Sequence, residues 1–165
     1  MPDTLTYRKE PIPADVEAVR DIVVSTGFFN QAEVDMAADL VRERLEKGPE
    51  SGYFFLFAIH DGAIAGYTCY GPITGTQSSF DLYWIAVRDD RRGRGLGRAL
   101  MERTEALVSG LGGGQIYAET SSREQYGPTR RFYESCGYAV EALVRDFYAP
   151  GDSKVIYVKV VGKEF

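Results

Sequence analysis

A glycine-rich, cationic loop between two strongly patterned segments constrains the fold more than any other stretch of the chain. The run FDLYWIAV at 80–87 is apolar and aromatic, which favours a strand. Residues 91–108 then read RRGRGLGRALMERTEALV, so three glycines lie among arginines directly before a helical segment. A helix start leaves backbone N–H groups without partners, and glycines let a ligand approach them. The stretch therefore predicts a strand–loop–helix unit that binds phosphate.

Two common phosphate-binding loops fit this spacing poorly. A Walker loop ends in Gly-Lys-Ser/Thr, whereas this loop ends in Gly-Arg-Ala. A Rossmann fingerprint is G-x-G-x-x-G after the first strand of a parallel sheet, but Gly93, Gly95 and Gly97 give G-x-G-x-G in mid-chain. For the three glycines taken alone, the alternative to a phosphate-binding loop is a solvent-exposed turn that binds no ligand.

Composition and charge predict one soluble domain with a local cationic patch. The chain has 165 residues, 44% of them hydrophobic, and a net charge of -5. This acidic balance disfavours nucleic acid and membrane surfaces as partners, so the arginines suit a small anionic ligand. The two cysteines form no CxxC pair and no cluster with histidine, so we expect neither a disulfide framework nor a metal site. With no apolar signal core or membrane-length run, we expect a cytoplasmic protein.

Hydrophobic periodicity predicts the element order β-α-α-β-β-β-α-β-α-β-β. Asp15 is the expected cap of the first helix, and the leucines at 96, 100, 107 and 111 are expected on one side of the third. Asp61-Gly62 is a hairpin-turn signal, which places the adjacent His60 at the surface. The expected strands are 5–8, 53–60, 63–73, 80–87, 115–120, 138–148 and 154–161, and the expected helices are 13–27, 31–47, 96–109 and 127–135. This mixture predicts one α+β domain over residues 1–165 with a mainly antiparallel sheet.

Two blocks of the sequence resemble those of the GNAT acetyltransferase superfamily. WIAVRDDRRGRGLGRALM is similar to its acyl-CoA-binding segment, a strand followed by Arg/Gln-x-x-Gly-x-Gly/Ala at a helix start, with Arg92, Gly95 and Gly97 at the named positions. TRRFYESCGY resembles the short helix with Phe-Tyr and then a Gly-aromatic pair that follows the next strand. The resemblance implies the GNAT fold, a mixed, mainly antiparallel sheet of six to seven strands flanked by about four helices.

The resemblance also implies acetyl-CoA as cosubstrate. Its pyrophosphate is expected on backbone N–H groups of the loop, and its pantetheine arm on exposed backbone of the preceding strand. Where the family often has Asn and Ala before a tyrosine, this chain has Tyr126 and Thr129, so Thr129 or Arg130 is expected to replace that contact. The other implied binding residues are Ile85, Ala86, Val87, Arg92, Gly93, Arg94, Gly95, Leu96, Gly97 and Arg98.

Three side chains are candidates for proton transfer. Tyr133 matches the family tyrosine that acts as general acid toward the departing thiolate, and the alternative is that it only packs. Asp81 is the first candidate base, directly or through water, and strand alternation places it on one face with Tyr83 and Ile85. Glu119 is the second candidate, and a structural ion pair or cap is the alternative role for Asp81.

The acceptor is indicated less specifically. The segments ETSSREQY and DFYAPGDSKVIYVK are similar to a bacterial subgroup that acts on small amino acids, D-alanine among them. The resemblance therefore implies direct attack by a small primary amine, whose carboxylate Arg123, Arg130 or Arg131 could receive. A non-catalytic acyl-CoA-binding sensor is the alternative function. Because the superfamily is frequently dimeric, a homodimer is a further expectation.

Overall fold

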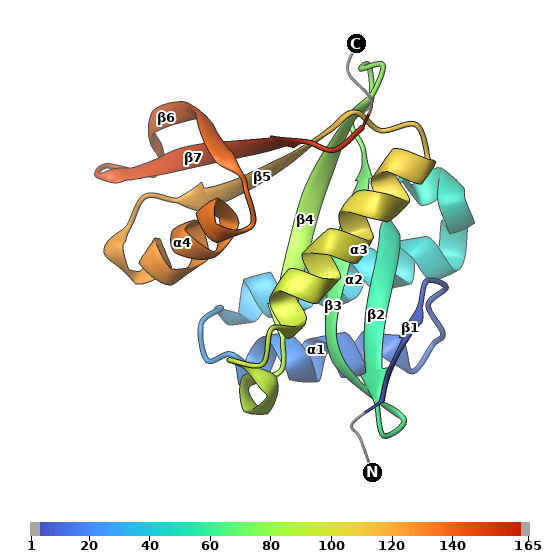
Figure 1. The fold of residues 1–165 in the computed structure, drawn as a ribbon. Coiled ribbons are helices and arrows are strands. Elements are labelled where there is room, and N and C mark those ends of the chain that lie inside the picture. Colours follow the sequence, from blue (N-terminus) through green and yellow to red (C-terminus); the bar gives the residue numbers. More distant parts are fainter. Residues whose placement is uncertain (1–3, 163–165) are drawn as a thin grey trace. The chain divides into compact units, whose positions relative to one another are not determined.

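The computed structural model describes residues 4–162, and in these residues a seven-stranded mixed sheet is accompanied by four α-helices (Figure 1). The strand order is β1-β2-β3-β4-β5-β7-β6. The pairs β1–β2, β2–β3, β5–β7 and β6–β7 are antiparallel, and β4–β5 is parallel. The expected α+β class and mainly antiparallel sheet are thereby confirmed.

The element bounds agree closely with the hydrophobic patterning. The strands are β1 (Leu5–Arg8), β2 (Phe54–His60), β3 (Ala63–Pro72), β4 (Ser79–Val87), β5 (Gln115–Ser121), β6 (Ala139–Ala149) and β7 (Asp152–Val160). The helices are α1 (Asp15–Ser25), α2 (Gln31–Lys47), α3 (Leu96–Gly110) and α4 (Gly127–Ser135), with the 3₁₀ turns η1 (Gly48–Ser51), η2 (Asp89–Arg91) and η3 (Glu124–Tyr126). The element order is as predicted.

The chain divides into two compact units. The first comprises Met1–Gly71 with Trp84–Thr104, and the second comprises Pro72–Tyr83 with Glu105–Phe165. The first unit holds β1, β2, α1, α2 and the glycine loop, whereas the second holds β5, α4, β6 and β7. β3, β4 and α3 each contribute residues to both units.

The core of the first unit forms where α1 and α2 bury their apolar stripes against β2 and β3. Val19, Ile22 and Val23 of α1 are buried in one cluster with Phe57 and Tyr67 of the two strands. The Phe57 and Tyr67 rings stack with centroids 6.2 Å apart. Burial of this much aromatic and β-branched surface is the main stabilisation available to the unit.

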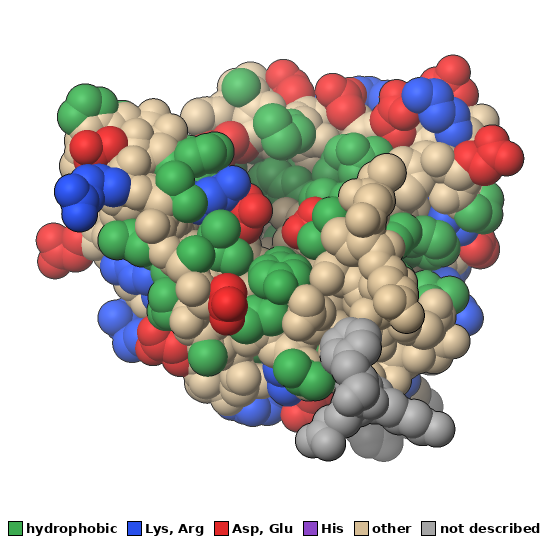
Figure 2. Space-filling view, turned by 90° about the horizontal axis from the view of Figure 1, so that it is seen from above, with side chains coloured by type: hydrophobic (Ala, Val, Ile, Leu, Met, Phe, Trp, Pro, Cys, Tyr) green, Lys and Arg blue, Asp and Glu red, His purple; other side chains and the backbone are tan. Residues whose placement is uncertain are grey.

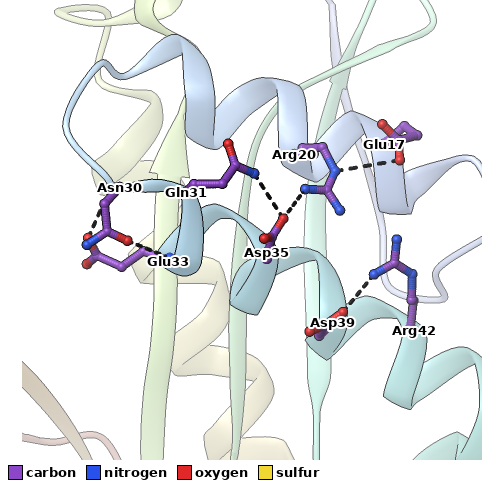
Figure 3. Close-up of polar contacts among 8 residues, drawn as sticks. All are labelled: Glu17, Arg20, Asn30, Gln31, Glu33, Asp35, Asp39 and Arg42. Atoms are coloured by element: carbon purple, nitrogen blue, oxygen red, sulfur yellow. Dashed lines mark hydrogen bonds and ion pairs between the residues drawn. The ribbon is translucent and has the colours of Figure 1, made fainter.

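Polar contacts set the start of α2 and link it to α1 (Figure 3). Asn30 Oδ1 accepts from the Glu33 N–H at 2.9 Å, and Glu33 Oε1 accepts from the Asn30 N–H at 3.1 Å, which forms a capping box. Arg20 of α1 contacts Asp35 of α2 with an Nη1–Oδ1 distance of 2.5 Å. Both contacts are at the surface, so they orient the helices more than they stabilise them.

The predicted cap of α1 differs in detail from the structure. The capping position is Ala14, and Asp15 is instead a buried residue of the first turn. Its carboxylate accepts from the Ile12 N–H at 2.7 Å and from the Arg8 guanidinium at 2.6 Å. The carboxylate therefore joins β1 to α1, a side-chain contact that the hydrophobic pattern does not encode.

The predicted apolar side of α3 is only partly correct. Leu96 and Leu100 are buried, but Leu111 is 55% exposed. The helix ends at Gly110, and the Gly113 N–H bonds back to the Val108 carbonyl at 2.8 Å, which turns the chain before Leu111 can extend the stripe.

Two features are absent from the described part of the chain. No helix within residues 4–162 combines the length and apolarity needed to cross a membrane. Over the same residues, no group of three or more His, Cys, Asp or Glu side chains is placed to hold a metal ion.

Candidate active site

The entrance to the glycine loop is tied to neighbouring elements of the first unit. The Arg88 N–H donates to the Ala65 carbonyl of β3 at 2.9 Å. The Asp89 N–H donates to Ser25 Oγ at the end of α1 at 3.3 Å, and the Arg91 N–H closes the η2 turn on the Arg88 carbonyl at 2.9 Å. The loop therefore starts from a fixed point.

The exposed loop residues 92–95 lead directly into the first turn of α3. Gly93 and Gly95 both have φ of +77°, in the left-handed region that favours glycine. The Ala99 N–H donates to the Gly95 carbonyl at 3.1 Å, so the first helical hydrogen bond begins here. The N–H groups of Leu96 and Gly97 lie in the first turn, where the helix supplies no acceptor. This geometry fits an anion bound to backbone N–H groups.

The arginines of the loop differ in their surroundings. Arg91 Nη2 lies 2.5 Å from Nδ1 of His60, whereas the Arg92 side chain is 57% exposed and lies 3.8 Å from Asp89 through Nε. Arg94 is exposed. Arg92 and Arg94 are therefore the loop arginines that remain accessible to a ligand.

The expectation that His60 lies at the surface is wrong. The residue is only 6% exposed, because it pairs with Leu5 of β1 and Ala63 of β3 and contacts Arg91. The hairpin signal at Asp61-Gly62 is local. It does not reveal that Arg91, in a turn about thirty residues later, contacts His60, the residue before the hairpin. The pairing of His60 with Arg91 was therefore missed at the sequence level.

The end of β4 presents the backbone expected to hold the pantetheine arm. Ala86 is 6% exposed, while Ile85 and Val87 are half-buried. β3 lies close beside this segment at Gly66, where a Cβ would be only 3.0 Å from the Ala86 carbonyl oxygen. The parallel ladder joins Ser79–Leu82 to Gln115–Ala118 and, in the described residues, stops before Ile85.

Tyr133 belongs to an aromatic cluster in the second unit. Its ring centroid lies 5.9 Å from that of Tyr138 and 5.6 Å from that of Tyr157, and the residue is 6% exposed. Burial is the main cause that raises the pKa of the Tyr133 phenol above its ordinary value, with further contributions from Cys136 and Tyr157. The phenol therefore stays protonated at neutral pH, as a proton donor must.

The two candidate bases lie on the same face of the second unit. Asp81 pairs in register with Tyr117, so alternation places Glu119 on the same face as Asp81. Burial raises the pKa of the Asp81 carboxyl, the charge of Glu119 raises it further, and Lys154 lowers it. Glu119 is paired with Lys154 at 2.9 Å. Lys154 was not singled out from the sequence, where it is one charge at the start of a strand.

The remaining predicted residues surround the start of α4. Arg130 donates from Nη1 to the carbonyls of Ser121 at 2.6 Å and Arg123 at 2.9 Å, so it holds the turn after β5. Thr129 is half-buried, and the Arg123 and Arg131 side chains are exposed. The second unit thus brings Asp81 and Glu119 together and carries Thr129, Arg130 and Tyr133 on α4, whereas residues 85–87 and 92–98 belong to the first unit.

The chain matches known proteins over most of its length. Residues 16–138 match the model of the Acetyltransferase (GNAT) family. A crystal structure of a candidate GNAT acetyltransferase from Desulfovibrio desulfuricans is 46% identical, with a TM-score of 0.94 over 96% of this chain and 99% of the other. No curated protein sequence matches this chain significantly.

Two more distant structures share the fold. The ribosomal-protein-S18-alanine N-acetyltransferase of Escherichia coli is 19% identical, with a TM-score of 0.76 over 98% of this chain and 97% of the other. An aminoglycoside 6'-N-acetyltransferase complexed with coenzyme A is 16% identical, with a TM-score of 0.76 over 98% of this chain and 99% of the other.

Proposed function

Because the chain belongs to the acetyltransferase (GNAT) family and is thus an acyltransferase, we propose that it transfers the acetyl group of acetyl-CoA to the primary amine of a small acceptor. The observation that carries the proposal is the exposed loop directly before α3, which contains two left-handed glycines. The whole chain, residues 1–165, serves as one acetyltransferase domain in this proposal. The aminoglycoside acetyltransferase with the same fold was crystallised with coenzyme A, which supports acetyl-CoA as the donor.

The donor is held mainly by backbone atoms. N–H groups from Arg92 to Arg98 bind the pyrophosphate, and the exposed Arg92 and Arg94 side chains add charge-assisted contacts. The backbone of Ile85–Val87 pairs with the pantetheine arm as a neighbouring strand would. Thr129 contributes a further polar contact, while Arg130 acts by holding the turn between β5 and α4.

The reaction needs two proton transfers. The amine nitrogen attacks the thioester carbonyl carbon, so a C–N bond forms and the C–S bond breaks. The proton lost by the nitrogen passes to Asp81 or Glu119, directly or through water. The departing thiolate takes a proton from the Tyr133 phenol. The Tyr133 phenol is protonated at neutral pH, so its hydroxyl is available as the donor.

A small amino acid such as D-alanine is the proposed acceptor. Arg123 and Arg131 are the arginines that can receive its carboxylate, because the Arg130 guanidinium is engaged with two carbonyls. Lys, Arg, Asp and Glu side chains of both signs are mixed on the face drawn in Figure 2, which favours a small ligand over a polyanion such as nucleic acid. We place the enzyme in the cytoplasm, where acetyl-CoA is available.

The test is a panel of amino acids and amines supplied with acetyl-CoA while free thiol is measured. We expect turnover with at least one small amine, and none by Gly95→Glu, which adds a carboxylate where the pyrophosphate binds. Binding of CoA without turnover of any amine would favour a non-catalytic acyl-CoA-binding module. A folded protein that binds no CoA would contradict the proposal.

The proposed assembly is a homodimer formed through β6. This strand lies at the edge of the sheet, and all eleven of its residues are exposed. Its exposed large apolar side chains are Val140, Leu143, Val144, Phe147 and Tyr148. Antiparallel pairing of this edge with a second copy would bury these apolar side chains.

A further inference from the structure

We propose that His60 is a positioning residue that holds the glycine loop in the shape that binds CoA. This inference rests on the function proposed above. His60 is the last residue of β2 and the single histidine of the chain. It is 6% exposed, and its Nδ1 lies 2.5 Å from Nη2 of Arg91, the residue that directly precedes the exposed segment 92–95.

The chemistry of the contact defines the state of the imidazole. A guanidinium can only donate hydrogen bonds, so Nδ1 of His60 must accept from Arg91. An imidazole accepts at Nδ1 only when it is neutral and carries its proton on Nε2. Protonation at Nδ1 would remove the acceptor and bring two positive charges together. The hydrogen bond from Arg91 to Nδ1 of His60 therefore requires the neutral imidazole.

The position of Arg91 makes this contact relevant to the loop. η2 is tied by backbone bonds of Arg88 to β3 and of Asp89 to α1, and the Arg91 side chain adds a link to β2. The four residues that follow are exposed, and ordering exposed backbone on binding costs conformational entropy. A fixed starting point lowers this cost, so the contact should strengthen CoA binding without touching CoA.

Two charged side chains lie near Nδ1 of His60. Asp61, on the hairpin turn, approaches it to 3.5 Å through Oδ2, and Arg91 approaches it from η2. The register partners on β1 and β3, Leu5 and Ala63, are uncharged. A carboxylate has no proton to donate, so the hydrogen bond that Nδ1 accepts comes from Arg91.

Two substitutions separate the anchor from the bulk of the side chain. His60→Asn keeps an amide oxygen near the position of Nδ1 and does not titrate, whereas His60→Leu removes the acceptor and keeps an apolar side chain. We expect His60→Leu to weaken CoA binding roughly three- to tenfold at about pH 7.5, and His60→Asn to stay within about twofold of wild type. Isothermal titration calorimetry measures both dissociation constants.

Rescue and coupling provide readouts that a merely structural role would not change. His60→Asn should restore most of the CoA affinity that His60→Leu loses, because only the asparagine keeps an acceptor for Arg91. Arg91→Leu should cause the same loss as His60→Leu, and the double variant should be no worse than either single one.

The outcomes separate this inference from the proposed function. If wild type binds CoA and His60→Leu binds it equally well, or if the losses of His60→Leu and Arg91→Leu add, the inference is overturned alone. Should His60→Leu fail to fold, an Arg91→Leu variant that binds CoA as tightly as wild type overturns it. If folded wild type binds no CoA, both the proposed function and the inference are overturned.

Discussion

At the scale of single residues, the environment of Tyr133 distinguishes a proton donor from a packing residue. Tyr133→Phe removes the hydroxyl and keeps the ring contacts with Tyr138 and Tyr157. If the phenol protonates the thiolate, kcat should fall about a hundredfold while the dissociation constant for CoA stays unchanged. Steady-state kinetics and calorimetry measure the two quantities.

Tyr157→Phe is the matched control, because it removes a hydroxyl from the same aromatic cluster. That hydroxyl donates to Glu134 Oε1 at 3.1 Å. We expect this variant to retain kcat within about twofold, since the Tyr157 hydroxyl has no part in the proposed proton transfers. Equal losses in the two variants would assign Tyr133 a packing role only.

Asp81 should affect activity and stability in opposite directions. Burial and the neighbouring Glu119 raise the pKa of its carboxyl, so the folded state holds the proton more tightly than the unfolded state. Above the ordinary pKa the charged form therefore costs stability, and this cost is absent at low pH where the carboxyl is protonated. Asp81→Asn should raise Tm at neutral pH but not at about pH 3, and should lower kcat/KM.

The pH profile identifies the base. If Asp81 accepts the amine proton, the activity of wild type is lost as pH falls through its raised pKa, and Asp81→Asn lacks that limb. Glu119→Gln is the comparison, since that carboxylate is already paired with Lys154. A profile unchanged in Asp81→Asn but altered in Glu119→Gln would reverse the assignment.

At the scale of elements, the loop before α3 needs glycine because of its backbone conformation, not because a side chain would clash with neighbouring atoms. A Cβ at Gly93 meets no atom within 4 Å, yet the left-handed φ of +77° disfavours any other residue. Gly93→Ala should therefore cost about 1–2 kcal/mol of loop conformation and weaken CoA binding roughly tenfold. Calorimetric titration with CoA measures this effect.

Gly110→Ala is the control for Gly93→Ala. This glycine ends α3, has equally open surroundings and does not have a left-handed φ. Alanine is a better helix former than glycine, so affinity should be unchanged and Tm slightly higher. A similar loss of CoA affinity in both variants would mean that glycine content, not the conformation of Gly93, determines binding.

Element bounds could be predicted because their signals are local. Asp61-Gly62 adopts the two left-handed conformations of a tight hairpin, and Gly48, with φ of +66°, ends α2 as the sequence indicated. Asp15 was placed wrongly because its ion pair with Arg8 depends on how β1 packs beside α1. His60 and Lys154 could not be placed, because each is defined by a partner distant in sequence. For the same reason, the sequence named Asp81 and Glu119 as bases but not the lysine that pairs with one of them.

At the scale of the whole molecule, the oligomeric state of the protein in solution tests the proposed dimer. Sedimentation velocity should give a dimer for wild type and a monomer for Leu143→Arg, because pairing would bury the charged arginine among the apolar side chains of β6. Leu111→Arg is the control, since Leu111 is equally apolar and 55% exposed but lies outside β6. A monomeric wild type, or dissociation by both variants, would contradict a β6 dimer.

The place of β7 in the sheet has a consequence for how the protein is made. β7 (Asp152–Val160) is the last strand along the chain, yet it lies between β5 and β6. During synthesis, β5 and the apolar β6 therefore leave the ribosome before the strand that joins them exists, and chains generally fold from the N-terminus as they emerge. Nascent chains thus pass through a stage in which β6 has no neighbouring strand. At that stage, binding by chaperones or aggregation competes with completion of the sheet.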